Sequence, residues 1–337
     1  MSPYLGASEV RVTIGMCVKN SEATIKEAVE SVLTQDYPSQ SMELLVVDGR
    51  SRDNTLKILE NSLRGAKIGV RMFSESEGLG RARQIVVDNA SGEYIVWVDG
   101  DMTLDKGFVK KQVEFMDHHP DAGIAKGKYG VRINGKRETV VATLENVEFL
   151  LATASEGRTD SKALGASGCV YRVKALKQVG GFDTGIKGVG EDMDIEDRIR
   201  RKGWQLHVSS AIFFETRRQT WKALWSEYFW HGSGGRYMFE KNKRAINIEK
   251  MFPPWAILAE LLRVPAAYRL THRKVVLFLP FHYAFKRVAW FLGFLESARA
   301  NLKLTRRNRF SNKLTRNLLK EKAKSTSCPR RIVEARV

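Results

Sequence analysis

Cysteine is scarce in this chain of 337 residues, which has only Cys17, Cys169 and Cys328. The three lie far apart and form no Cys-x-x-Cys or Cys/His spacing, which argues against a disulfide framework and against a zinc site. A signal peptide, with a charged and then an apolar segment, does not open the sequence. These absences favour a reducing, cytosolic setting. The composition, 43% hydrophobic and 28% charged, is that of a globular protein that can build a core.

Acidic residues are scarce in the last two-fifths of the chain. Residues 201–337 contain 29 lysines and arginines but 8 aspartates and glutamates, which gives +21; residues 1–200 contain 27 and 30, which gives −3. The net charge of +18 therefore comes entirely from the second part. Such an asymmetry indicates an anionic partner, either phospholipid headgroups or nucleic acid.

Apolar, β-branched segments alternate with segments of helical periodicity over the first hundred residues. The predicted strands cover 10–18, 44–48, 68–73 and 93–99, and the predicted helices lie between them. Strands and helices in alternation indicate βαβ units and a parallel sheet. In such a sheet, ligands bind beyond the carboxyl ends of the strands.

Polar side chains follow three of these strands at that edge. Asn20, Asp48 and Asp99 each come at the end of a predicted strand, and Asp101 follows Asp99 after one glycine. Two fixed carboxylates can hold Mg²⁺ or Mn²⁺, which prefer oxygen ligands. A solvated acidic turn is the alternative interpretation of Asp99 and Asp101.

Further elements are predicted beyond residue 120. Short strands with a turn at 134–136 are expected over 120–140, and a helix over 143–155. A second helix is expected over 189–203, with an acidic first turn and a basic last turn that suit the helix dipole.

Two strongly apolar segments, 255–262 and 275–295, follow a pair of prolines. The second is long enough to span a membrane, but Lys286 and Arg287 interrupt it, and a charge pair in the middle of a bilayer is costly. We therefore expect helices that lie in the headgroup plane, fringed by lysine and arginine, and we keep a true span as the less favoured alternative.

Five motif-bearing segments occur in order along the chain: TIGMCVKNSEATIKEAVESVLTQDYP (13–38), LLVVDGRSRDNT (44–55), EGLGRARQ (77–84), GEYIVWVDGD (92–101), and GGFD (180–183) with GEDMDIEDRIRRKGW (190–204). Together they resemble the family 2 glycosyltransferases, which use nucleotide sugars. The resemblance implies an α/β fold of the GT-A type, a Rossmann-like, mixed but mainly parallel sheet flanked by helices. An amphipathic helical region is expected to follow it.

The resemblance also implies roles for individual residues. Asp192, beside Glu191, would be the catalytic base. Asp99, Asp101 and Glu215 would hold Mn²⁺ or Mg²⁺. The nucleotide-sugar site would comprise Asn20, Glu22, Asp48, Gly49, Ser51, Gly78, Arg83 and Asp99.

Each of these roles has a structural alternative. Asp48 could simply cap the turn that follows it, and Arg83 could lie on a helix surface. Glu191 and Asp192 could serve only to stabilise a helix N-terminus. The chain also departs from the family pattern, because Gly49 replaces a second acidic residue and Glu215 stands where many relatives have histidine.

The implied reaction is inverting transfer of a sugar from a nucleoside-diphosphate sugar, most often a UDP-sugar, to a hydroxyl. A base such as Asp192 favours a hydroxyl acceptor, because the phosphate acceptor of a polyprenyl-phosphate sugar synthase needs none. With the basic, apolar C-terminal region, this predicts a lipid-linked glycan or glycolipid acceptor and a peripheral or monotopic protein on the cytoplasmic face of an anionic membrane.

Two rival functions fit the sequence less well. A nucleic-acid-binding protein could use the basic region, but its charges alternate with long aliphatic runs, so no nucleic-acid partner is expected. A dinucleotide oxidoreductase would need GxGxxG after the first strand, where this chain has KNSEAT. The expected organisation is a catalytic domain over 1–240, membrane-associating helices over 241–305 and a basic tail over 306–337.

Overall fold

A computed structural model describes residues 10–130, 139–152, 157–159, 163–186, 188–241 and 252–299. The predicted turn at 134–136 and the predicted tail at 306–337 lie outside these residues.

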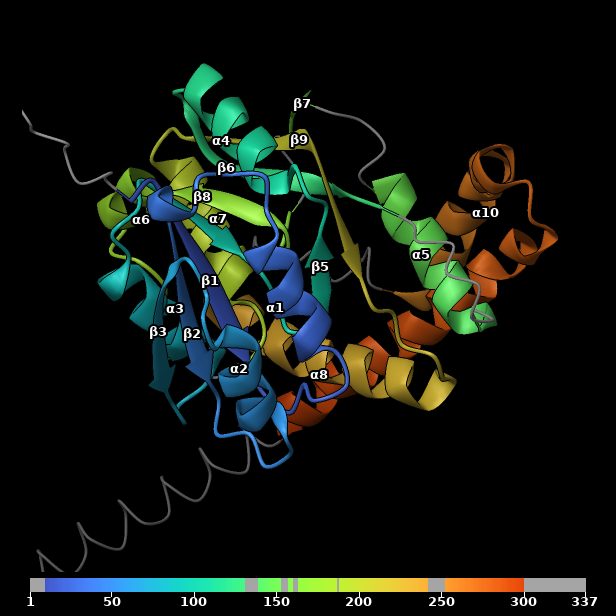
Figure 1. The fold of residues 1–337 in the computed structure, drawn as a ribbon. Coiled ribbons are helices and arrows are strands. Elements are labelled where there is room, and N and C mark those ends of the chain that lie inside the picture. Colours follow the sequence, from blue (N-terminus) through green and yellow to red (C-terminus); the bar gives the residue numbers. More distant parts are fainter. Residues whose placement is uncertain are drawn as a thin grey trace, which may run out of the picture.

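One mixed sheet forms the centre of the molecule (Figure 1). Its strand order is β3-β2-β1-β4-β8-β6-β9-β5, and β7 pairs with β9. The first four strands of this order are mutually parallel, β6 and β9 are parallel to each other, and β8 and β5 run antiparallel to their neighbours. The strands are β1 (Val12–Val18), β2 (Met42–Asp48), β3 (Gly69–Ser74), β4 (Tyr94–Trp97), β5 (Met102–Leu104), β6 (Ala122–Tyr129), β7 (Gly157–Arg158), β8 (Cys169–Arg172) and β9 (Gln205–Glu215).

Helices cover both faces of the sheet (Figure 1). Alternate residues of β1, β2 and β4 face opposite ways, as the two-residue period of a strand requires. One set packs with α1, α2 and α4, and the other with α3, α6 and α7. The bounds are α1 (Ile25–Leu33), α2 (Thr55–Leu63), α3 (Leu79–Asn89), α4 (Phe108–His118), α6 (Val173–Gln178) and α7 (Glu191–Arg201), with a 3₁₀ turn η1 (Ser39–Ser41).

The remaining helices lie to one side and below the sheet in Figure 1. They are α5 (Val140–Ala152), α8 (Trp221–Lys241) and α10 (Pro253–Thr271), followed by the 3₁₀ turn η2 (Lys274–Phe278) and a helix over 279–299. Helices α5 and α10 lie side by side. A small apolar cluster joins α5, α10 and η2.

The predicted fold class is confirmed: the sheet is mixed, mainly parallel in its first half, and flanked by helices. The third predicted strand is β3, which lies at the edge of the sheet and is largely exposed. The long strand β9 was not predicted, although it carries Glu215 to the same edge as Asp101.

Candidate active site

The carboxyl ends of β1 and β2 meet in register, with Val18 opposite Asp48. A cleft of about 400 Å³ opens beyond these ends and beside the first turn of α3. Two predicted site residues, Gly49 and Gly78, line it. The full lining is Cys17, Val18, Lys19, Val47, Gly49, Glu75, Ser76, Gly78, Leu79, Ala82 and Trp230.

The loop after β1 is fastened to the loop after β2 by side chains that the sequence assigned to the nucleotide. The Asn20 side-chain oxygen accepts a hydrogen bond from the Arg52 backbone N–H at 2.8 Å. Glu22 accepts one from the Asn54 backbone N–H at 2.9 Å. Both side chains therefore shape the cleft's rim, and neither is among the residues that line it.

Asp48 is buried at the end of β2. Its carboxylate accepts hydrogen bonds from the backbone N–H of Ser51 at 3.0 Å and from the Ser51 hydroxyl at 2.6 Å. The Ser51 hydroxyl in turn accepts the Asn20 backbone N–H at 2.9 Å. Asp48 thus caps the turn that follows β2, which is the structural role considered for it in the sequence analysis. It also holds the wall of the cleft in place.

Arg83 is buried inside the site and does not lie on the helix surface. Its Nη1 lies 2.6 Å from Glu191 Oε1, and its Nη2 lies 3.9 Å from Asp99 Oδ1. Burial alone would lower the pKa of Arg83, but the carboxylates of Glu191, Asp99 and Asp192 outweigh it and raise that pKa. The guanidinium is therefore a fixed positive charge between α3 and α7.

Asp101, Glu215 and Asp99, the three residues that the resemblance implies as metal ligands, lie near one another. Burial, and then repulsion from Glu215 and Asp99, raises the pKa of Asp101 to about 7. Arg218 lies 3.8 Å from the Asp101 carboxylate and is drawn away by Glu227 at 2.7 Å. Arg217 forms an ion pair with Glu215, so each of these three carboxylates has an arginine near it.

Asp192 stands at the first turn of α7, next to the buried Glu191. Gly190 precedes the pair with φ +110°, a backbone conformation that favours glycine and turns the chain sharply into the helix. The Asp192 carboxylate accepts a hydrogen bond from the neighbouring Met193 N–H at 2.7 Å and is only partly buried. It is the more accessible member of the acidic pair.

Several site residues were not predicted. The Ser167 hydroxyl donates to Asp99, and the buried Lys126 ammonium donates to the carbonyls of Leu164 and Ser167 at 2.5 and 2.9 Å. The buried Glu196 accepts the backbone N–H of Gly165 at 2.8 Å, near Asp192. Lys126 and Ser167 are more than twenty positions from any predicted site residue, whereas Glu196 lies four positions after Asp192, inside the quoted segment 190–204.

A second acidic group lies outside the site. Glu145, Glu148 and His282 offer ligand atoms within 4.8 Å of one another. Lys286 already occupies the space between the carboxylates, with its ammonium 2.6 Å from Glu145 and 2.5 Å from Glu148. We therefore interpret this group as a buried ion-pair cluster, not as a metal site.

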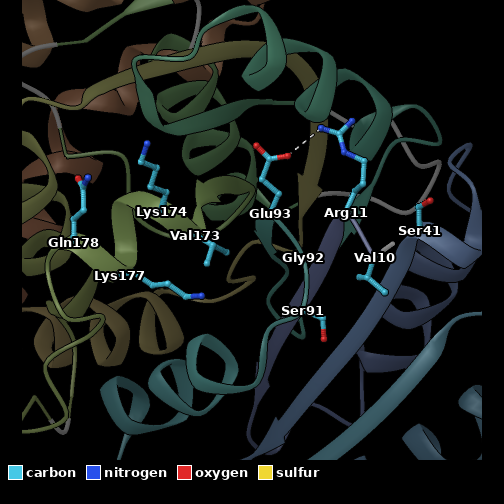
Figure 2. Close-up of a pocket in the computed structure, with 10 residues that line it drawn as sticks. All are labelled: Val10, Arg11, Ser41, Ser91, Gly92, Glu93, Val173, Lys174, Lys177 and Gln178. Atoms are coloured by element: carbon cyan, nitrogen blue, oxygen red, sulfur yellow. Dashed lines mark hydrogen bonds and ion pairs between the residues drawn. The ribbon is translucent and has the colours of Figure 1, made fainter. Parts of the chain in front are cut away.

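A larger cavity, of about 1000 Å³, lies at the opposite, amino ends of β1 and β4. Figure 2 shows Lys174, Lys177 and Gln178 on one side of it, with Arg11 and Glu93 joined by an ion pair on the other. Its polar groups are surface side chains, and none of the predicted site residues lines it. The convergent, buried polar groups lie at the other edge of the sheet.

Comparison with known proteins agrees with this geometry. The sequence model described as glycosyl transferase family 2 matches residues 13–180, about half of the chain. The chain belongs to glycosyltransferase family 2. The matched segment contains the first strand, Asp48, Arg83 and the Asp99–Asp101 pair, and it ends before Asp192.

Two curated relatives match parts of the chain. The poly(ribitol-phosphate) β-N-acetylglucosaminyltransferase TarS of Staphylococcus aureus is 34% identical over 119 residues, 35% of this chain and 20% of that protein. The poly-β-1,6-N-acetyl-D-glucosamine synthase of Staphylococcus epidermidis is 24% identical over 233 residues, 65% of this chain and 53% of that protein. The chain thus matches a fifth to about half of the length of these relatives.

A solved structure shares the fold. The mannosyltransferase PcManGT of Pyrobaculum calidifontis, solved in complex with GDP-mannose and Mn²⁺, superposes with a TM-score of 0.60 at 16% identity. The alignment covers 86% of this chain and 87% of that one. At this identity the similarity establishes the fold, which is of the GT-A type.

Proposed function

We propose that this family 2 glycosyltransferase transfers a sugar from a nucleoside-diphosphate sugar to a hydroxyl acceptor with inversion of configuration. The observation that carries the proposal is the convergence, at one edge of the sheet, of a cleft, a fixed cation and two acidic groups of different kind. The cleft suits the nucleotide, and Arg83 is a positive charge beside it. A UDP-sugar is the first donor to test.

The carboxylates of Asp99, Asp101 and Glu215 suit a hard divalent cation. They supply only oxygen donors, and burial, followed by repulsion from Glu215 and Asp99, raises the pKa of Asp101. These three residues would hold Mn²⁺ or Mg²⁺, which, when bound, would stabilise the charge of the departing diphosphate as a Lewis acid.

Asp192 is the proposed base. It would take the proton from the attacking acceptor hydroxyl on the face of the sugar opposite the leaving group, so that the configuration inverts. Glu191 is buried and lies against Arg83, so we assign it to holding that arginine rather than to proton transfer. Asp192 is then the one carboxylate of this pair that is available as a base, which fits an inverting reaction with a single displacement at the sugar.

A thermal-shift assay tests the donor half of the proposal. UDP, GDP, NAD and duplex DNA are each added with and without Mn²⁺, to the wild type and to Asp101→Asn. One nucleoside diphosphate at 100 times its Kd should stabilise the wild type by about 2.7 kcal/mol, only with metal, and the variant much less. Stabilisation by NAD or DNA instead, or by no nucleotide, would refute it.

We further propose that the acceptor is a lipid-linked glycan or a glycolipid, reached from an anionic membrane surface. Large apolar side chains are exposed on α10, η2 and the helix that follows; Leu262 is 78% and Leu277 65% exposed. Arg269 and Lys274 are exposed beside them. The apolar patch comprises Trp255, Leu258, Leu261, Leu262, Leu270, Leu277, Phe278 and Phe281.

The stretch Lys274–Arg299 is long and apolar enough to cross a membrane by length and composition, although 39% of its most apolar window is buried against the protein. His282 and Lys286 point into the protein at the ion-pair cluster. The helix buries these two polar groups and leaves Phe281, Val288, Leu292 and Leu295 exposed. Such a surface suits a position in the membrane surface on the cytoplasmic face, as a peripheral or monotopic protein.

Vesicle flotation tests the membrane partner. The wild type should float with phosphatidylglycerol-containing vesicles. Leu262→Glu/Leu277→Glu should bind at least about 150-fold more weakly, because each buried leucine contributes about 1.5–3 kcal/mol. Leu56→Glu, at an exposed position on α2, is the matched control. If Leu262→Glu/Leu277→Glu and Leu56→Glu bound the vesicles equally well, the apolar patch would be excluded as the membrane-binding surface. A parallel assay with polyprenyl phosphate and with a lipid-linked glycan separates the two acceptor classes.

A further inference from the structure

The cleft at the carboxyl ends of β1 and β2 is closed by one residue from a distant part of the chain. Ten of its lining residues lie between positions 17 and 82, and the eleventh is Trp230 on α8. Trp230 is also the only aromatic residue among them. It lies outside the segment that the family model matches.

The Trp230 ring is available to a ligand. Although tryptophan is among the largest apolar side chains, Trp230 is 48% exposed. Its nearest aromatic contact is the His231 ring, at 5.8 Å between centroids and tilted by 37°, so neither indole face is stacked on another aromatic side chain of the described residues. Val18, Val47 and Leu79 supply apolar surface elsewhere in the same cleft.

Helix α8 is held firmly in the position that brings Trp230 to the cleft. Glu227 pairs with Arg218, which lies beside Asp101. Two turns further along the same face, Gly234 and Met238 contact the backbone just before Glu191. Residues 227, 230, 234 and 238 share one face of the helix because they are three or four positions apart.

The opposite face of α8 is packed against the helix over 279–299. A side chain at Gly232 would overlap the backbone of Trp290, and one at Gly293 would overlap the backbone of Phe229. The two helices therefore approach each other closely, as small residues allow. Trp230 is thus presented by a rigid support, and a rigid aromatic side chain binds with little loss of conformational freedom.

We propose that the nucleotide's base stacks on the Trp230 indole, which makes this residue a donor-positioning residue; the inference rests on the proposed function. A flat heteroaromatic base offers a π-face to an aromatic side chain whatever its hydrogen-bonding pattern. The apolar walls favour the base over the charged diphosphate, for which the fixed charge of Arg83 lies deeper in the site. Trp230 therefore binds the base end of the donor.

Calorimetric titration of the full chain with UDP and Mn²⁺ tests the inference, with GDP in place of UDP if GDP is the nucleotide that stabilises the chain. Trp230→Ala should raise the Kd about 5- to 150-fold, because base stacking contributes about 1–3 kcal/mol. Trp230→Phe should stay within a few fold of the wild type. Tyr237→Ala, an exposed aromatic on the same helix that does not line the cleft, should leave the Kd unchanged.

Two further readouts make the result specific. UDP should quench the tryptophan fluorescence of the wild type. The quenching should be smaller in Trp230→Phe, which lacks this indole. The loss of affinity in Trp230→Ala should be equal for UDP and for the UDP-sugar, and it should appear in KM rather than in kcat. A loss seen only with the UDP-sugar would place the indole on the sugar and overturn the assignment.

An unchanged Kd for UDP in Trp230→Ala would also overturn it. Failure of the wild type to bind any nucleoside diphosphate would instead refute the proposed function. The thermal unfolding midpoint of each variant without ligand shows whether it is folded, and the half-exposed position of Trp230 predicts only a small change.

Discussion

The sheet and the C-terminal helices distribute polar and apolar groups in opposite ways. In the sheet, the central strands β1, β2 and β4 are buried and mostly apolar, and charged groups gather at the strand ends. In the helices over 253–299, many of the largest apolar side chains face outward, while Lys286 and His282 are completely or almost completely buried. Apart from a small apolar cluster, charge pairs join these helices to α5.

This difference indicates that the two regions are built for different surroundings. Large apolar side chains that are exposed on neighbouring helices, as on α10 and η2, are typical of an interaction site. An ion pair between Lys286 and Glu145 also fixes how the helix is rotated, because turning it would leave charges unpaired in the interior. The helix over 279–299 therefore keeps Lys286 and His282 on α5, while Trp290 and Phe294 are buried in a cluster with Met238 of α8.

The largest expected effect concerns catalysis at the sheet's edge. Asp192→Asn should lower kcat by about 10²- to 10⁴-fold, the usual contribution of a general base. The unfolding midpoint should hardly change, because the Asp192 carboxylate accepts a hydrogen bond only from its neighbour Met193 among the described residues.

Asp197→Asn is the matched control for Asp192→Asn. Asp197 is on the same helix and forms an exposed ion pair with Arg201, so its loss should leave kcat unchanged. Steady-state turnover of a nucleotide sugar measures both variants. Equal turnover by the two would show that the acidic start of α7 serves the helix and not the reaction.

Breaking the ion-pair cluster should have a large effect on stability, but only in the helical region. Lys286→Met leaves Glu145 and Glu148 facing each other without a cation, which costs about 3–5 kcal/mol for a buried pair. Hydrogen exchange should become faster in α5 and over 279–299 and stay slow in β1, β2 and β4.

A triple variant, Lys286→Met/Glu145→Gln/Glu148→Gln, removes the repelling charges as well and should recover much of the protection. If Lys286→Met instead exposed the strands of the sheet to exchange, the two regions would form one cooperative unit, and the contrast between them would not extend to their stability.

The sequence predicts best what is local. The alternation of strands and helices in the first hundred residues places Asp48 and Asp99 at strand ends, and the two strands lie on either side of β1, as the parallel order requires. The structure brings Asp101 near Glu215, and the shared role in metal binding that the family pattern implies stays a prediction. The fold class therefore follows from hydrophobic periodicity and motif order.

What the sequence does not predict depends on contacts between distant residues. Lys286 and Glu145 are 141 positions apart, and in the sequence Lys286 is simply a charge that interrupts an apolar run. Trp230 reaches the cleft only because α8 packs beneath the site. Likewise, Ser167 supports Asp99 through a hydrogen bond across 68 positions, which leaves no periodic pattern in the sequence.

The smallest expected effect concerns a buried carboxylate of the sheet, which can be compared with the buried charges of the C-terminal helices. Glu43, at the start of β2, is the sheet's own buried carboxylate with a complete set of partners. It accepts hydrogen bonds from the Thr13 hydroxyl at 2.7 Å and the Ser91 N–H at 2.6 Å, and it pairs with Arg71 at 2.7 Å. Burial acts to raise the pKa of Glu43, but these partners outweigh it, so the pKa lies below 4.5 in the folded protein.

The carboxylate of Glu43 therefore stabilises the fold fully above pH 4.5 and loses this contribution as the pH falls below that value through the folded pKa. Glu43→Gln should lower the free energy of unfolding by about 1–2 kcal/mol at pH 7, and by less at pH 3.5. Denaturant titrations at the two pH values measure the difference, with Glu60→Gln at an exposed position of α2 as the control. An equal loss at both pH values would mean that the shape of the side chain, rather than its charge, matters at this position.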